Sequence, residues 1–195
     1  MKLLKFTFAV SLIAIFQLLS FGQVPLRGTV TEIIDGRTLV VEPKPNLRIK
    51  IQLNYLEVPE PEQPLHQVVK DHLTKLALNK RVEFVTHGIS SKNVSYGQVF
   101  VDGIDLTQQM LRDGAAWYTS KGKNVGVGAD EIYRENEGQA KNENRGVWSI
   151  DGMKTPWEFR AEKAERARQK KLAELKELQA KRIAEIEAAQ AEREA

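Results

Sequence analysis

The most informative stretch of this 195-residue chain is Ile51-Gln52-Leu53-Asn54-Tyr55-Leu56-Glu57-Val58-Pro59-Glu60. It begins inside residues 47–53, where apolar and polar side chains alternate, as is typical of a half-buried strand. It then enters a loop over 54–64 that is rich in proline and glutamate. The stretch therefore joins a half-buried strand to a loop that carries the carboxylates of Glu57 and Glu60.

The sequence on either side of this stretch predicts further strands and helices. Two β-prone runs, 27–34 and 38–42, flank the turn signal Asp35-Gly36, which predicts a hairpin. Further strands are expected over 82–86 and 98–101, and helices over 65–78, 106–113 and 129–144. Five short strands with three helices indicate an α+β fold compatible with an oligonucleotide/oligosaccharide-binding (OB) barrel. The pattern alone does not choose this barrel over other small sheets.

Composition and charge exclude several classes of protein. The chain has no cysteine, which excludes disulfides, thiolate nucleophiles and Cys-zinc sites. The net charge is +3, but residues 23–160 hold 18 basic and 18 acidic side chains, so the excess lies at the two ends. Non-specific nucleic-acid binders usually present a basic surface. The neutral middle therefore disfavours nucleic acid as a partner, while leaving it open.

The first 22 residues have the pattern of a secretory signal peptide. Lys2 and Lys5 precede an apolar run over 6–19, and small residues stand before a cut at Gln23. The run is short for a membrane-spanning helix, which needs about 20 apolar residues. We expect an exported protein, periplasmic or secreted, with an uncleaved membrane anchor as the alternative. The expected domains are a signal peptide (1–22), an OB domain (23–160) and a tail (161–195).

The tail predicts a long charged helix. It contains no glycine or proline and consists almost wholly of good helix formers. Leu172 and Leu175 recur eleven residues later as Ile183 and Ile186, a period that gives a narrow apolar stripe. Two interpretations remain open. The tail is either an exposed helix with ion pairs along it, or a coiled-coil-like helix for docking or self-association.

Six segments, in the same order along the chain, carry a resemblance to a known family. They are Ile34-Asp35-Gly36-Arg37-Thr38-Leu39, residues 51–60, Tyr96-Gly97-Gln98, residues 111–117, Arg145-Gly146-Val147-Trp148 and Pro156-Trp157-Glu158-Phe159-Arg160. Between Gly28 and Arg160 the chain resembles the thermonuclease (staphylococcal nuclease-like) family, a calcium-dependent nuclease domain built on an OB barrel. The resemblance implies that barrel here, with Trp117, Trp148 and Trp157 packed in its core.

The resemblance also implies where the family's catalytic groups would lie. The family holds Ca²⁺ with two Asp, activates water with a Glu and stabilises the phosphate with two Arg. The first metal Asp falls on Arg37 and the second on Glu57. The water-activating Glu falls on Glu60. The two arginine positions are occupied by Gln52 and Gln98. Only Glu60 is unchanged, and it is expected to be vestigial.

These replacements predict a non-catalytic module rather than a nuclease. Hard cations need oxygen ligands, and phosphoryl transfer needs positive charge on the phosphate. We expect a binding or scaffold module that needs no cofactor and has a protein or envelope partner. The alternative is a divergent Ca²⁺-dependent nuclease or phosphodiesterase that uses Glu60 and Glu57.

For the site itself, two arrangements remain open. Arg37 either pairs with Glu57 or Glu60 and closes the pocket, or binds an anion without metal. In the second arrangement Lys50 adds charge, and Tyr96 stacks on a ligand ring.

Overall fold

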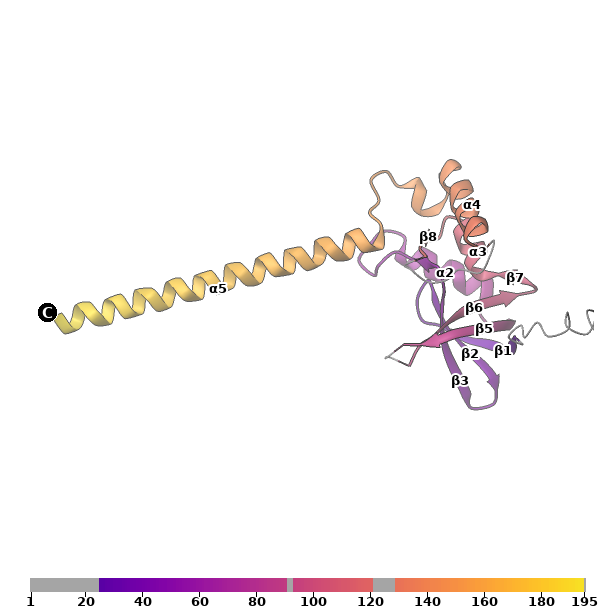
Figure 1. The fold of residues 1–195 in the computed structure, drawn as a ribbon, viewed down its shortest axis with the longest axis horizontal. Coiled ribbons are helices and arrows are strands. Elements are labelled where there is room, and N and C mark those ends of the chain that lie inside the picture. Colours follow the sequence, from indigo (N-terminus) through magenta and orange to yellow (C-terminus); the bar gives the residue numbers. More distant parts are fainter. Residues whose placement is uncertain (1–24, 91–92, 121–128, 195) are drawn as a thin grey trace, which may run out of the picture.

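The β-prone runs of the chain close into a five-stranded barrel in the computed structural model, which describes residues 25–90, 93–120 and 129–194. The barrel strands are β1 (Leu26–Ile33), β2 (Thr38–Lys44), β3 (Leu47–Leu53), β5 (Arg81–Ile89) and β6 (Ser95–Val101) (Figure 1). β1 pairs antiparallel with β2 and β5, and the β2–β3 and β5–β6 pairs are also antiparallel. A parallel pairing of β3 with β6 closes the barrel, with Gln52 opposite Tyr96.

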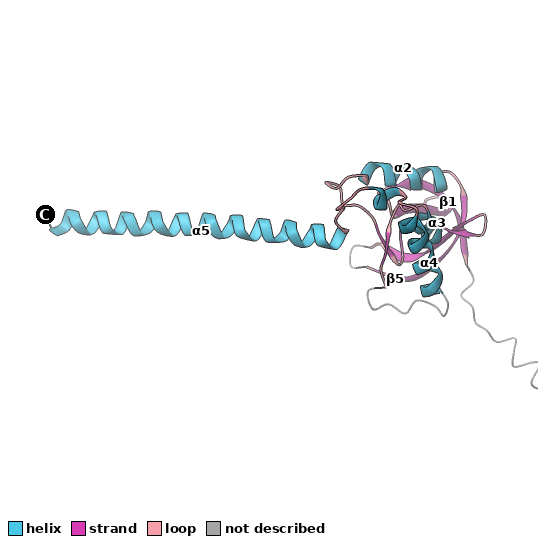
Figure 2. Ribbon diagram, turned by 90° about the horizontal axis from the view of Figure 1, so that it is seen from above, coloured by secondary structure: helices cyan, strands magenta, loops and turns pink. Residues whose placement is uncertain are grey.

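Further strands and helices surround the barrel or extend from it. They are β4 (Leu56–Glu57), which pairs with β8 (Trp117–Tyr118), β7 (Ile104–Asp105) on the edge of β6, α2 (His66–Ala77), α3 (Leu106–Arg112), α4 (Ala129–Asn142), the 3₁₀ helix η1 (Gly146–Ser149) and α5 (Pro156–Glu194). α3 packs against α4 and β6. Figure 2 shows α2, α3 and α4 gathered on the barrel, with α5 running away from it. The fold is the expected α+β OB barrel with helices.

The core fills the barrel and the space beneath the helices. Its fully buried side chains include Phe84, Leu39, Ile51, Leu73 and Met110. β6 alternates between buried and partly covered side chains along its whole length, as expected for a strand with one face on the core. A Cβ on Gly97 would lie 2.3 Å from the carbonyl oxygen of Val85, so β5 and β6 approach too closely there for any other residue.

Most of the predicted elements are confirmed, with three corrections. β5 and β6 each extend several residues beyond the predicted runs, to Arg81–Ile89 and Ser95–Val101. Leu47 was expected to face the core with Ile51, but it is 40% exposed because it lies at the tip of the β2–β3 hairpin. Trp157 was expected in the core and is 39% exposed on the first turn of α5. Trp117, in contrast, is buried and packs edge-on against Trp148.

The predicted tail helix begins earlier than expected. α5 starts at Pro156, a favourable first-turn residue, so its first turns belong to the barrel domain rather than to the tail. From Lys163 to Arg193 every side chain is exposed. The predicted signal peptide, 1–22, lies outside the described residues. Within the part of the chain that is described, no helix is both long and apolar enough to cross a membrane.

Candidate functional site

The turn before β2 and the end of β3 bring the first two site residues together. Asp35 Oδ1 accepts a hydrogen bond from the Arg37 backbone N–H at 2.8 Å, which fixes the turn. The Arg37 carbonyl in turn accepts from the Leu53 N–H at 2.8 Å. Because Thr38 pairs with Gln52 in the β2–β3 register, the side chain of Arg37 lies beside that of Gln52.

Arg37 is held by two neighbours. Its Nη1 lies 2.9 Å from Glu57 Oε2. With the Gln52 amide oriented so that its oxygen faces the guanidinium, Oε1 accepts from Nε at 2.7 Å and from Nη2 at 3.0 Å. Glu57 is only 6% exposed, because β4 pairs with β8 and covers it. The residue at the first metal position is therefore a cation bonded to the residue at the second.

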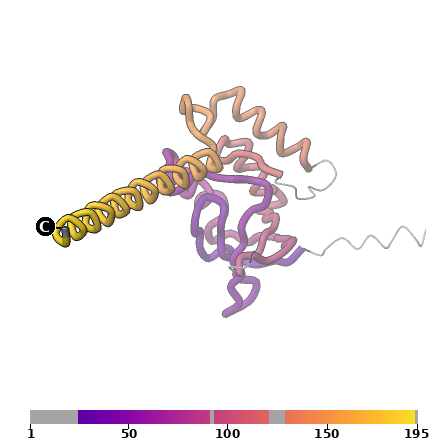
Figure 3. The backbone as a smooth tube through the Cα atoms, turned by 60° about the vertical axis from the view of Figure 1, so that its left-hand side comes forward, coloured from indigo at the N-terminus to yellow at the C-terminus, as the bar shows by residue number. Residues whose placement is uncertain are grey.

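A second guanidinium reaches the same carboxylates from α5. Arg160 Nη1 lies 3.2 Å from Glu57 Oε2 and also donates to Glu60 Oε1. Burial alone would lower the pKa of Arg160, but its bonds to Glu60 and Glu57 raise it above the usual value. One turn later Lys163 pairs with Glu62 in the same loop. Figure 3 shows α5 starting beside this loop. We call Arg37, Glu57, Glu60 and Arg160 the four-charge cluster.

These residues do not suit a calcium ion. Ca²⁺ takes six to eight oxygen ligands, several of them carboxylates free to bind it. In the four-charge cluster two carboxylates face two guanidinium groups, so the charges already cancel. Among the described residues, no three or more His, Asp or Glu side chains are grouped so that they could hold a metal. The donor set supports an ion-pair cluster instead.

A small polar pocket opens beside the cluster. Its volume is about 220 Å³, and its lining includes Arg37, Gln52, Asn54, Tyr55 and Tyr96. Asn54 is 3% exposed, and its side-chain Oδ1 has no hydrogen-bond partner within the described structure. A buried polar atom without a partner costs free energy unless something binds it. The pocket therefore combines aromatic walls with guanidinium donors, and a buried amide oxygen without a partner belongs to one of its lining residues.

Gln98, at the second arginine position, takes part in a different network. Its Nε2 donates to Tyr133 Oη at 2.9 Å and to Asp105 Oδ2 at 3.4 Å. Its Oε1 lies 3.3 Å from His87 Nε2. Tyr133 is fully buried and donates to Asp105 Oδ2 at 2.7 Å. Burial raises the pKa of Asp105, although the bonds from Tyr133, Thr107 and Gln98 oppose the rise. We call Gln98, Tyr133 and Asp105 the neutral network, after the uncharged amide of Gln98 that stands where the resemblance places an arginine.

The structure thus brings together some of the predicted site residues and separates others. Arg37, Gln52, Glu57 and Tyr96 line one pocket, and Glu60 joins them through Arg160. Lys50 is exposed on β3, outside that lining set. Of the two pairings that the sequence left open for Arg37, the structure has the one with Glu57.

Sequence reasoning missed Arg160 and Tyr133. Arg160 ends the last of the six matched segments, so its position carried a signal. Its charge acquires meaning only once α5 is known to pass the loop that holds Glu57 and Glu60. Tyr133 had no motif, and only its burial on α4 reveals its role.

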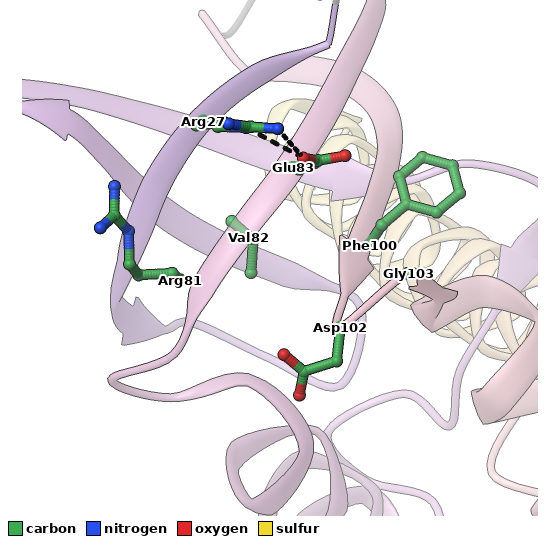
Figure 4. Close-up of a pocket in the computed structure, with 7 residues that line it drawn as sticks. All are labelled: Arg27, Arg81, Val82, Glu83, Phe100, Asp102 and Gly103. Carbon is green, nitrogen blue, oxygen red and sulfur yellow. Dashed lines mark hydrogen bonds and ion pairs between the residues drawn. The ribbon is translucent and has the colours of Figure 1, made fainter.

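A second pocket of about 320 Å³ is lined by residues of β1, β5 and the end of β6 with the turn that follows it (Figure 4). Arg27 and Glu83 on its wall pair with each other at 2.7 Å, and Arg81 and Asp102 point elsewhere. None of these residues stands at a position that the family resemblance assigns to catalysis.

The comparisons agree with this fold. The family model described as "Staphylococcal nuclease homologue" matches residues 50–150. An uncharacterized endonuclease of Escherichia coli O157:H7 is 27% identical over 139 residues, which is 71% of this chain and 87% of the relative. A probable staphylococcal-like nuclease of Oryza sativa subsp. japonica is 26% identical over 60% of this chain. A probable endonuclease of Komagataella phaffii is 29% identical over 59% of it. The chain spans 34% of the rice relative and 55% of the yeast one.

Proposed function

The chain belongs to the staphylococcal nuclease homologue family, and from this premise we propose that its barrel domain binds a partner without cleaving nucleic acid. One observation carries the proposal. Glu57, the carboxylate at a metal position, bonds to both Arg37 and Arg160. A cation that bound there would have to displace two guanidinium groups from a buried carboxylate.

The loss of reaction rate expected from these replacements supports a non-catalytic role. Removing a single transition-state arginine costs about 10³–10⁵ in the rate of phosphoryl transfer. Here glutamine stands at both arginine positions, and the side chain of Gln98 is hydrogen-bonded within the neutral network. Such losses are not additive, yet one of them is enough to bring cleavage near background.

The pocket beside the cluster supports binding of a small polar group. Arg37 contributes donors, and Tyr55 and Tyr96 contribute aromatic walls. The charges of the four-charge cluster cancel, which favours a group with little net charge over a phosphate chain. We take the occupant to be part of a protein or envelope partner, met after export of the chain through the segment 1–22. In this scheme residues 23–160 bind and 161–195 form a separate arm.

Cleavage of fluorogenic single-stranded DNA by the full chain, with excess Ca²⁺ against EDTA, tests the proposal. We expect no Ca²⁺-dependent cleavage. The matched control is the triple variant Arg37→Asp, Gln52→Arg, Gln98→Arg, which restores the family residue at three of the four replaced positions. Partial recovery in that variant would show that the groove is intact and that the replacements removed the chemistry.

The competing function is a divergent Ca²⁺-dependent nuclease. It is favoured by the names of the relatives and by Glu60, which keeps the family's water-activating carboxylate. Ca²⁺-dependent cleavage by the unchanged chain, abolished by Glu60→Gln, would replace our proposal with this one.

A further inference from the structure

The outer part of α5 is a surface that nothing in the described structure covers. Five large apolar side chains lie on it, each between 48% and 58% exposed: Leu172, Leu175, Leu178, Ile183 and Ile186. An isolated helix of this kind gains little from its own packing, since helices are stabilised mainly by burying an apolar face. The question is what could cover this face.

The order of residues along the face has a symmetry. One line of neighbouring positions reads Glu165, Arg168, Leu172, Leu175, Gln179, Ile183, Ile186, Gln190 and Arg193. The spacings between them are three or four residues throughout, so all nine lie on one side of the helix. The sequence of spacings is the same from either end, with Gln179 at the centre. An antiparallel copy of the helix would therefore present the same line in register.

When two copies of this line of residues face each other in antiparallel orientation, the side chains that meet are also chemically complementary. Leu172 faces Ile186 of the second copy, and Leu175 faces Ile183. Glu165 faces Arg193, and Gln179 faces itself, so its amide can both donate and accept. Every opposed pair is apolar with apolar, acid with base, or includes a neutral amide. This is the self-complementarity that a two-fold interface requires.

The residues beside the line add charge complementarity. On one flank the antiparallel register brings Lys171 within two residues of the level of Glu185 of the second copy, and Glu174 within two residues of the level of Arg182. Leu178 lies on the same flank and meets Leu178 of the second copy. On the other flank, no two like charges lie opposite each other near the centre of the coil.

A parallel pair in register lacks this complementarity. It would oppose Glu165 to Glu165, Arg168 to Arg168 and Arg193 to Arg193. Like charges directly across a helix seam disfavour association and commonly set its orientation. The charges therefore select the antiparallel arrangement.

We propose that α5 pairs with α5 of a second copy of this chain as an antiparallel two-helix coil centred on Gln179. The pairing covers 164–194, a length of about 45 Å at 1.5 Å per residue. Arg160 and Lys163 tie the start of each helix to the Glu57–Glu62 loop of its own domain. The two barrels then sit at opposite ends of the coil, and their pockets are held apart at a fixed distance.

The oligomeric state of the full chain tests whether the apolar face of α5 forms the proposed interface. Sedimentation velocity at about 100 μM should show a dimer that dissociates on dilution. Ile183→Lys places a charge against Leu175 of the second copy and should give a monomer. Ala188→Lys, which lies half a turn around the helix from the line through Gln179, is the matched control and should leave the dimer intact. A monomeric unchanged chain, or equal effects of the two lysines, would overturn the proposal.

Cysteine cross-linking tests the orientation, because the chain has no cysteine of its own. Arg168→Cys and Gln190→Cys are made in separate chains. Under oxidation each variant alone should stay uncross-linked, since two copies of residue 168 lie about 33 Å apart in the antiparallel coil. The mixture should form a covalent heterodimer. Self-cross-linking of Arg168→Cys would show a parallel pair and contradict the proposed arrangement.

Discussion

The four-charge cluster and the neutral network accommodate, in opposite ways, the residues that stand where the family resemblance places catalytic groups. At Arg37 the family's charge is reversed, and the new cation is balanced by Glu57 while Arg160 joins from α5. At Gln98 the family's charge is absent, and the amide is absorbed into hydrogen bonds with Tyr133 and Asp105. A reversed charge needs new counter-ions, whereas a removed charge needs only new hydrogen bonds.

The largest expected effect comes from removing both cations of the four-charge cluster. Arg37→Ala with Arg160→Ala leaves the buried Glu57 carboxylate without a guanidinium partner. We expect the free energy of unfolding, measured with urea, to fall by about 3–5 kcal/mol. Adding Glu57→Gln removes the uncompensated charge and should recover a large part of the loss. A loss unaffected by Glu57→Gln would mean that the arginines act through packing rather than charge.

Tyr133→Phe is the corresponding change in the neutral network. It deletes the hydroxyl that donates to Asp105 and accepts from Gln98, while keeping the buried ring. We expect the free energy of unfolding to fall by about 1–3 kcal/mol, the cost of leaving buried polar groups short of a partner. Phe100→Tyr, which adds a hydroxyl on a partly covered strand position outside this network, serves as the reciprocal control and should change stability less.

The pH dependence of stability reports on Asp105 in the neutral network. The pKa of Asp105 is raised in the folded protein, so above the ordinary Asp value of 3.8 the folded state keeps a proton that the unfolded state has lost. Stability from this group is therefore present at low pH and is lost as the pH rises through the folded-state pKa. Urea unfolding between pH 3 and 7 should show this slope, and Asp105→Asn should flatten it. An unchanged slope in the variant would assign the effect to another group.

The smallest effect is expected at Glu60. Its side chain is more exposed than that of Glu57, and its bond to Arg160 is screened by water. Glu60→Gln should lower the free energy of unfolding by less than about 1 kcal/mol. A loss as large as that of the double arginine variant would show that the cluster depends on Glu60 rather than on Glu57.

The sequence predicted the barrel well and the site only in part. Alternation in 47–53 and the turn at Asp35-Gly36 are local signals, so strand order followed once the family motifs set the register. The pairing of Arg37 with Glu57 was among the expected alternatives. The contribution of Arg160 could not be predicted, because it depends on the direction in which α5 leaves the barrel, and no local pattern encodes that direction. The outward position of Leu47 likewise depends on the hairpin reaching past the core.

The most direct test of the account is the melting temperature of the full chain with and without millimolar Ca²⁺. A ligand that binds only the folded state stabilises it by RT ln(1 + [L]/Kd) and therefore raises the melting temperature. Because two guanidinium groups hold Glu57, we predict no Ca²⁺-dependent shift for the unchanged chain. The triple variant Arg37→Asp, Gln52→Arg, Gln98→Arg should acquire one. A clear rise for the unchanged chain would show that Ca²⁺ displaces the arginines, and would contradict the account.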